Sequence, residues 1–174
     1  NGNGNTISGL TINASSTSVA GLFGFVGSGG TVKNVGLTGG SVSGGVIMGD
    51  LIGLNAGTVT NSYATGTVNG SASAATVGGL IGTNEGVITG SYATGAVNGG
   101  IVTGGLAGSN EGTISQSYAT GNVTAGDVAF AGGLVGINLN TLHGNGHVVV
   151  ASITNSYATG NVSVAYAADS LSVW

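Results

Sequence analysis

The chain has 174 residues, of which only 3% are charged, with one Lys or Arg against five Asp or Glu. So few cations exclude binding to nucleic-acid phosphates or a basic amphipathic membrane helix, and no apolar run reaches the ~18 residues of a membrane span. The chain has no Cys, which excludes disulfides and thiolate metal sites, and its 41% hydrophobic content is that of an ordered chain.

A five-residue word, Ser-Tyr-Ala-Thr-Gly, occurs four times without change, at 62–66, 91–95, 117–121 and 156–160. A leucine, mostly within Gly-Leu-x-Gly, marks the same phase at steps of 29, 29, 26 and 28 residues: Leu22, Leu51, Leu80, Leu106 and Leu134. Self-similarity at a nearly fixed period indicates a repeat architecture, in which equivalent residues lie on top of one another.

We interpret residues 1–174 as a single domain that opens with a partial turn at 1–20. Complete repeats then begin at residues 21, 50, 79, 105 and 133. Leu134 and Tyr157 are 23 positions apart, whereas the corresponding spacing is 12 in the three preceding repeats, so the last repeat carries an insertion near 139–149. The chain starts at Asn1 without a Met or a signal peptide, and we therefore expect a processed product or a piece of a longer protein.

Each unit contains short extended stretches rich in Val, Ile, Thr and Tyr and bounded by Gly and Asn. In the second unit they are 51–54, 58–68 with a bend, and 76–78. No 3.6-residue apolar period occurs over a helical length. The pattern predicts an all-β fold, a right-handed parallel β-helix (β-solenoid) of about 5–6 turns of 26–29 residues with three short strands per turn. An antiparallel sandwich is the alternative, but it does not require identical words in phase.

Alternation along the repeated word decides which residues face the core. Counting by twos from Val68 places Ser62 and Ala64 inside and Tyr63 outside, whereas counting from Val59 places the tyrosine inside. We favour the first count, since small inward residues suit a narrow coil. The outward residues would then form a ligand or assembly face: Tyr63, Thr65, Tyr92, Thr94, Tyr118, Thr120, Tyr157 and Thr159.

A second rank consists of asparagines, each followed two residues later by Gly or Asn: Asn55, Asn84, Asn110 and Asn138. Both residue types tolerate positive φ, so we expect a corner closed by stacked amides. Leu51 and Ile52 are adjacent apolar residues that cannot both face inward unless the chain turns there. If the second one faces outward, it forms an apolar stripe that needs a partner.

Two pairs of residues could carry chemistry. Glu85 and Glu111 occupy equivalent corners, and two carboxylates ~5 Å apart are what a retaining glycosidase needs, although a solvated acidic edge is the better interpretation. His143 and His147 have the spacing of a metal pair without an evident third ligand. We therefore predict no catalytic residue, no metal and no cofactor. Glycosylation sequons begin at four asparagines: Asn13, Asn69, Asn122 and Asn161.

The segment from Gly79 to Gly86, Gly-Leu-Ile-Gly-Thr-Asn-Glu-Gly, followed by Ser-Tyr-Ala-Thr-Gly at 91–95, resembles the GLUG motif, and residues 1–12 resemble the lead-in that often precedes it. Residues 35–37, Asp50 and the insertion depart from the pattern. The resemblance implies a large secreted or surface-anchored microbial protein. Examples are filamentous-haemagglutinin-like adhesins and the non-catalytic regions of IgA-cleaving metallopeptidases. It implies no catalytic residues within the repeat.

These observations predict a non-enzymatic, extracellular structural or adhesive β-solenoid module of a microbial surface protein, stalk or fibre, secreted or at the cell surface. Its partners would be further copies of itself, stacked end to end or laterally, or surface glycans or proteins. One alternative is the subunit of a self-assembling extracellular filament. Another is a carbohydrate- or ice-binding face on the Tyr/Thr ladder, although the next outward rank, Thr67, Ala96, Asn122 and Asn161, is irregular.

Overall fold

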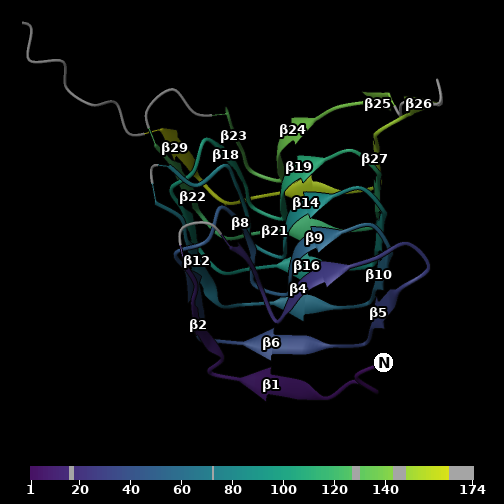
Figure 1. Cartoon of the computed structure of the whole chain (residues 1–174), viewed down its shortest axis with the longest axis horizontal. Coiled ribbons are helices and arrows are strands. Elements are labelled where there is room, and N and C mark those ends of the chain that lie inside the picture. The colour runs from purple at the N-terminus through teal and green to yellow at the C-terminus, as the bar shows by residue number, and fades with distance from the viewer. Residues whose placement is uncertain (16–17, 72, 127–129, 143–147, 165–174) are drawn as a thin grey trace, which may run out of the picture.

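The structure, a computed structural model, describes residues 1–15, 18–71, 73–126, 130–142 and 148–164. In these residues it consists of short strands stacked in parallel columns, with no helix (Figure 1). Each turn of the chain adds one strand to each of five columns, so a strand pairs with the equivalent strand of the next turn. This is an all-β parallel β-solenoid, as the repeat period predicts.

Two of the columns have six strands each. Sheet A contains the repeated tyrosine and is formed by β1 (Thr6–Ser8), β6 (Gly36–Thr38), β11 (Tyr63–Ala64), β16 (Tyr92–Ala93), β21 (Tyr118–Ala119) and β28 (Tyr157–Ala158). Sheet B follows it in every turn and is formed by β2 (Thr11–Asn13), β7 (Ser41–Ser43), β12 (Thr67–Asn69), β17 (Val97–Asn98), β22 (Val123–Ala125) and β29 (Val162–Val164).

The other three columns have five strands each. Sheet C comprises β3 (Val19–Ala20), β8 (Ile47–Gly49), β13 (Thr76–Gly78), β18 (Val102–Gly104) and β23 (Phe130–Gly132). Sheet D comprises β4 (Phe23–Val26), β9 (Ile52–Asn55), β14 (Ile81–Asn84), β19 (Ala107–Asn110) and β24 (Val135–Asn138). Sheet E comprises β5 (Thr31–Lys33), β10 (Thr58–Thr60), β15 (Val87–Thr89), β20 (Thr113–Ser115) and β27 (Ser152–Thr154).

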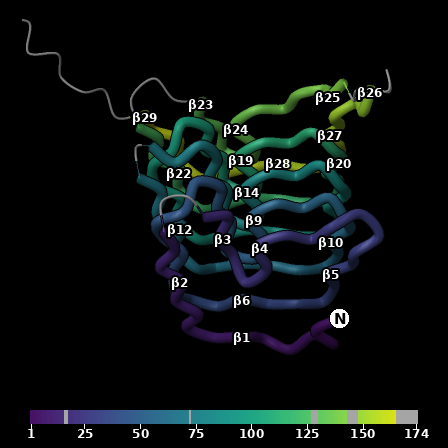
Figure 2. The backbone as a smooth tube through the Cα atoms, viewed as in Figure 1, coloured from purple at the N-terminus to yellow at the C-terminus, as the bar shows by residue number. Residues whose placement is uncertain are grey.

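The stack starts with β1 and grows by one turn at a time towards β28 and β29, as the tube in Figure 2 shows. The predicted insertion contains two strands that leave the coil, β25 (Thr141–Leu142) and β26 (Val148–Val149), which pair antiparallel. Figure 1 places this hairpin at the end of the stack that is opposite to β1.

The number of strands per turn differs from the prediction. Three were expected, but five are present, because the stretch 58–68 is not one bent strand but β10, β11 and β12. Asn61 lies between the first two strands with φ of 48°, a left-handed conformation that ends extended backbone. Gly66 lies between the second and third strands, where a Cβ would be 2.5 Å from the Asp50 carboxylate.

The number of turns also differs from the expected 5–6. Sheets C, D and E each have five strands, so their first and last strands are separated by four turns (5 − 1 = 4). The expected number includes the partial turn at 1–20 and counts each of the five repeats as a turn of its own.

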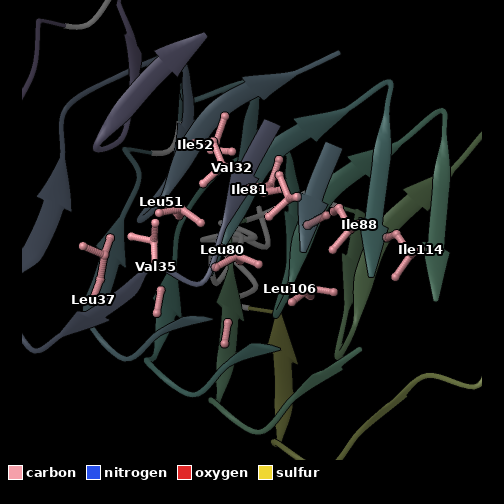
Figure 3. Packing of buried hydrophobic residues seen from close by; sticks show 14 of the residues in the cluster. Val32, Val35, Leu37, Leu51, Ile52, Leu80, Ile81, Ile88, Leu106 and Ile114 are labelled. Atoms are coloured by element: carbon pink, nitrogen blue, oxygen red, sulfur yellow. The ribbon is translucent and has the colours of Figure 1, made fainter. Parts of the chain in front are cut away.

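The core is a column of apolar side chains inside the coil (Figure 3). Leu51, Leu80 and Leu106 form one buried rank, and Val59, Ile88 and Ile114 form another on sheet E. Full burial of one such side chain stabilises a fold by about 1.5–3 kcal/mol. A second cluster lies between sheets B and C and includes Val42, Met48, Val68, Val77 and Val97.

The adjacent apolar ranks at the corner are both buried. Leu51 and Ile52 have no exposed surface, and the same holds for Leu80 and Ile81. The chain turns between sheets C and D at this point, so successive side chains both enter the core. The apolar stripe that an outward second rank would have produced is therefore absent from these turns.

Candidate functional site

The repeated word forms the strand of sheet A and its flanks. The positive φ of Asn61 turns the chain into this sheet. Side chains then alternate between the two faces of the strand, and Ser62 and Ala64 point inward, where both are fully buried. Tyr63 and Thr65 point outward and remain partly exposed. The count from Val68 is thus the correct one, and the count that placed the tyrosine inside is wrong.

The inward serines form a hydrogen-bonded ladder along the coil. The Ser62 backbone N–H donates to Oγ of Ser91 at 3.2 Å, and the Ser91 N–H donates to Oγ of Ser117 at 3.2 Å. The hydroxyls of Ser62 and Ser91 donate in turn to the carbonyls two residues earlier, those of Thr60 and Thr89, at 3.0 Å. Ser therefore satisfies a backbone donor of the turn before it as well as its own hydroxyl inside the coil.

The tyrosines form a stack on the outer face of sheet A. Ring centroids are 4.9 Å apart for Tyr63 and Tyr92, 4.8 Å for Tyr92 and Tyr118, and 5.2 Å for Tyr118 and Tyr157, with interplanar angles of 3°, 5° and 7°. Burial raises the pKa of Tyr92, and its two tyrosine neighbours raise it further. Each stacked pair contributes about 0.5–1.5 kcal/mol.

This stacking changes what the tyrosine face can bind. The faces of Tyr92 and Tyr118 are covered by their neighbours, so only ring edges and hydroxyl groups remain open. Sugars that bind aromatic residues by stacking need a free ring face, which these two positions lack. Tyr157, at the end of the stack, is 55% exposed, and among the described residues it stacks on the ring of Tyr118 alone.

The predicted threonines lie beside this stack. Thr65 accepts a hydrogen bond of 2.9 Å from the Gly39 backbone N–H and is half-buried. Thr94, Thr120 and Thr159 are exposed. The Tyr and Thr residues therefore form two parallel ranks on one side of the coil.

The corner asparagines form an amide ladder, of which Asn55, Asn84 and Asn110 are buried. Nδ2 of Asn55 donates to Oδ1 of Asn84 at 2.8 Å, Asn84 donates to Asn110 at 2.7 Å, and Asn110 donates to Asn138 at 2.7 Å. A second Nδ2 bond in each of the first three residues reaches the carbonyl of the glycine two residues later. These asparagines end strands of sheet D, and they do not have the positive φ from which the corner is argued in the sequence.

Asp50 is a buried carboxyl group that the sequence pattern indicated only as a departure. It occupies the position of Gly79 and Gly105 in later turns and has no exposed surface. Its Oδ2 accepts a hydrogen bond of 3.0 Å from the Gly66 N–H, and its Oδ1 has no hydrogen-bond partner among the residues that the structure describes. Burial raises the pKa of Asp50 to about 6, partly offset by the Gly66 bond. The sequence feature that marks this residue is an acidic side chain at a position that is glycine in the next two repeats.

The two glutamates lie at the edge of a small cavity. The cavity has a volume of about 220 Å³ and is lined by Ala56, Glu85, Glu111, Thr141 and Val149. Thr141, from the inserted hairpin, donates to Oε2 of Glu111 at 2.6 Å. The hairpin thus covers one glutamate, whereas Glu85 stays exposed.

No group of three or more potential metal ligands occurs in the part of the chain that the structure describes. His143 and His147 lie outside the described residues. The same described part contains no helix that is long and apolar enough to cross a membrane.

Comparisons with known proteins agree with this geometry. The model of the GLUG motif matches residues 73–98 and 131–163. The first region runs from β13 to β17, one strand from each of the five sheets, and the second contains β24 to β28. No solved structure matches the chain.

A stretch of 71 residues, 41% of the chain, is 45% identical to Halomucin of Haloquadratum walsbyi (strain DSM 16790 / HBSQ001). This stretch covers 1% of that relative. The chain therefore carries GLUG repeats at 73–98 and 131–163, and the first of these forms one turn of a parallel β-solenoid.

Proposed function

We propose that the chain is a non-enzymatic, extracellular structural module that serves as a stiff segment in a microbial surface protein. The observation that carries this proposal is the alignment of all repeating interactions along one axis. Five backbone ladders, the Asn55–Asn138 amide ladder and the Tyr63–Tyr157 stack run in the same direction. Such an arrangement resists bending and places its stability in contacts between neighbouring turns.

Two further observations support this function. Polar side chains inside the coil are engaged in structural hydrogen bonds, as for the buried Ser62 and Asn84. The similarity to Halomucin, whose name contains the word mucin, favours an extracellular location. The scarcity of charge leaves little for electrostatic recognition of a partner.

Single-molecule force spectroscopy tests the mechanical role. The full chain is tethered at its two termini and stretched in buffer. A stiff solenoid releases length in repeated steps that each correspond to one turn of 26–29 residues. A chain that extends smoothly, without a resisting structure, would rule out a load-bearing segment. Antibody labelling of intact cells of the native source checks location, and labelling only after permeabilisation would contradict an extracellular role.

A second candidate is adhesion through the outer face of sheet A. The aligned hydroxyl groups of tyrosines and threonines on one side of the coil favour it, because they repeat at about the strand spacing of 4.8 Å. Recognition would use ring edges and hydroxyl groups. Glycan-array binding that is lost in Tyr118→Ala, and thermal hysteresis of ice growth, are the two assays. Absence of a signal in both removes this candidate.

A further inference from the structure

The amide ladder has a direction. Every bond in it runs from Nδ2 of one asparagine to Oδ1 of the asparagine in the next turn, ending at Asn138. Asn138 accepts from Asn110, is exposed, and donates its own Nδ2 to no acceptor among the residues that the structure describes. The last amide is therefore oriented to donate to one more acceptor at the corner.

The serine ladder has the same direction and ends in the same turn. Ser117 donates its backbone N–H to Oγ of Ser156 at 3.1 Å. The backbone N–H of Ser156 occupies the equivalent position, and in the described part of the chain it has no hydroxyl to donate to. Tyr157 is the next residue, and within the described ranges only one of its ring faces is stacked, on Tyr118.

The opposite end of the coil is closed by different residues. Val26 is paired with Asn55 in sheet D, so the amide ladder stops there, and Oδ1 of Asn55 accepts instead from the Gly57 N–H at 3.2 Å. Tyr63 lies over Gly36 and its hydroxyl contacts Oγ1 of Thr6 at 3.2 Å. Among the residues that the structure describes, the amide ladder and the tyrosine stack are therefore both closed at this end, and only backbone strand edges stay open.

We propose that the C-terminal end of the coil is a docking surface for one further GLUG-type turn, which brings a corner asparagine and a Ser-Tyr pair. Such a turn supplies an amide oxygen to Asn138, a hydroxyl to the Ser156 N–H and a ring to Tyr157. The asparagine, the serine and the tyrosine that supply these groups occur together in one repeat, so a single added turn provides all three. This proposal rests on the structural function and names the partner of the stack.

The first turn of a second copy does not have this chemistry. It presents Val26 where the asparagine is needed, and Asn5 and Thr6 where the Ser-Tyr pair is needed, as the register with β6 and β9 shows. Head-to-tail stacking of identical copies would leave the Asn138 amide and the Tyr157 face unmatched. The end surface therefore selects a complete repeat over the chain's own first turn.

The chain itself supplies both a matching and a non-matching turn for the experiment. In one variant, residues 165–174 are replaced by a second copy of residues 71–99, which contain Asn84, Ser91 and Tyr92. In the control variant they are replaced by residues 15–44, which have Val26, Val35 and Gly36 at the equivalent positions. Amide hydrogen exchange at Ser156 and nitration of Tyr157 are then measured in both and in the unmodified chain.

The matching turn is expected to slow exchange of the Ser156 amide by at least ~10-fold and to protect Tyr157 from nitration, whereas the control turn protects neither. Equal protection by both turns would show simple pairing of strand edges and would overturn the proposed selectivity. Lack of protection by either would overturn the docking surface itself. These results do not depend on the force and labelling measurements on the unmodified chain, so either proposal can fail alone.

Discussion

The carboxyl group of Asp50 accepts a hydrogen bond of 3.0 Å from the backbone N–H of Gly66 inside the coil, where Asp50 has no exposed surface. The pKa of this carboxyl is about 6 in the folded chain, against 3.8 for an ordinary Asp. Between these two pH values the folded state binds more protons than the unfolded state. Stability therefore falls as pH rises through this window, by about 3 kcal/mol in total.

Urea unfolding of the wild type and of Asp50→Asn between pH 3.5 and about pH 7 measures this effect. The variant is expected to lose the decrease, because its amide does not titrate. Glu85→Gln, which changes an exposed carboxylate, is the matched control and should follow the wild type. Wild-type stability that rises with pH over this window would contradict the assignment to Asp50.

Removal of a central amide should weaken the coil more than removal of the terminal one. Asn84→Ala deletes two ladder bonds and leaves Asn55 without its amide acceptor in the interior, whereas Asn138→Ala deletes one ladder bond at an exposed end. We expect a loss of about 2–4 kcal/mol for the first and about half of that for the second, since unsatisfied buried polar groups cost about 1–3 kcal/mol each. Denaturant titration gives both values, and equal losses would argue against a directional ladder.

The tyrosine stack should show the same dependence on position. Tyr92 stacks on two rings and Tyr157 on one. Tyr92→Ala is therefore expected to cost about 1–3 kcal/mol from stacking alone, and Tyr157→Ala about 0.5–1.5 kcal/mol. Thermal and urea unfolding measure the difference. A larger loss at Tyr157 would mean that stacking is not the main contribution of these rings.

Close approach of backbones between turns makes some glycines irreplaceable. A Cβ on Gly95 would collide with the Gly66 carbonyl of the preceding turn, whereas a Cβ on Gly126 would be 3.8 Å from the Gly100 carbonyl. Gly95→Ala is expected to destabilise the fold by more than about 2 kcal/mol, and Gly126→Ala to be nearly neutral. Far-UV circular dichroism during thermal unfolding distinguishes them, and a neutral Gly95→Ala would contradict the spacing of the turns.

Much of this architecture could be predicted because a stacked repeat forces equivalent residues into register. The fixed distance from Leu51 to Tyr63, repeated in the next two turns, predicts the solenoid, and the parity from Val68 predicts an outward tyrosine. The stretch 58–68 is predicted to contain a bend, and the structure places that bend at Asn61, at a positive φ.

Other features depend on geometry that a repeat pattern does not contain. The inward position of both Leu51 and Ile52 follows from a corner between sheets C and D, and alternation alone does not predict it. The contact of Thr141 with Glu111 depends on where the inserted hairpin folds. The burial of Asp50 depends on its place in a glycine rank, because the pattern alone does not show which ranks face inward.

Deletion of a whole turn tests the central claim most directly. This claim is that each repeat forms one complete turn of the coil, which can be removed without disturbing the others. Deletion of residues 79–104 removes one complete turn and joins Gly78 to Gly105, which restores the local sequence Gly-Gly-Leu. We predict a cooperative unfolding transition and an unchanged circular dichroism spectrum per residue for this variant. Deletion of residues 79–91 removes half a turn and should abolish the transition. Loss of cooperative unfolding in the whole-turn deletion, or its retention in the half-turn deletion, would contradict the account.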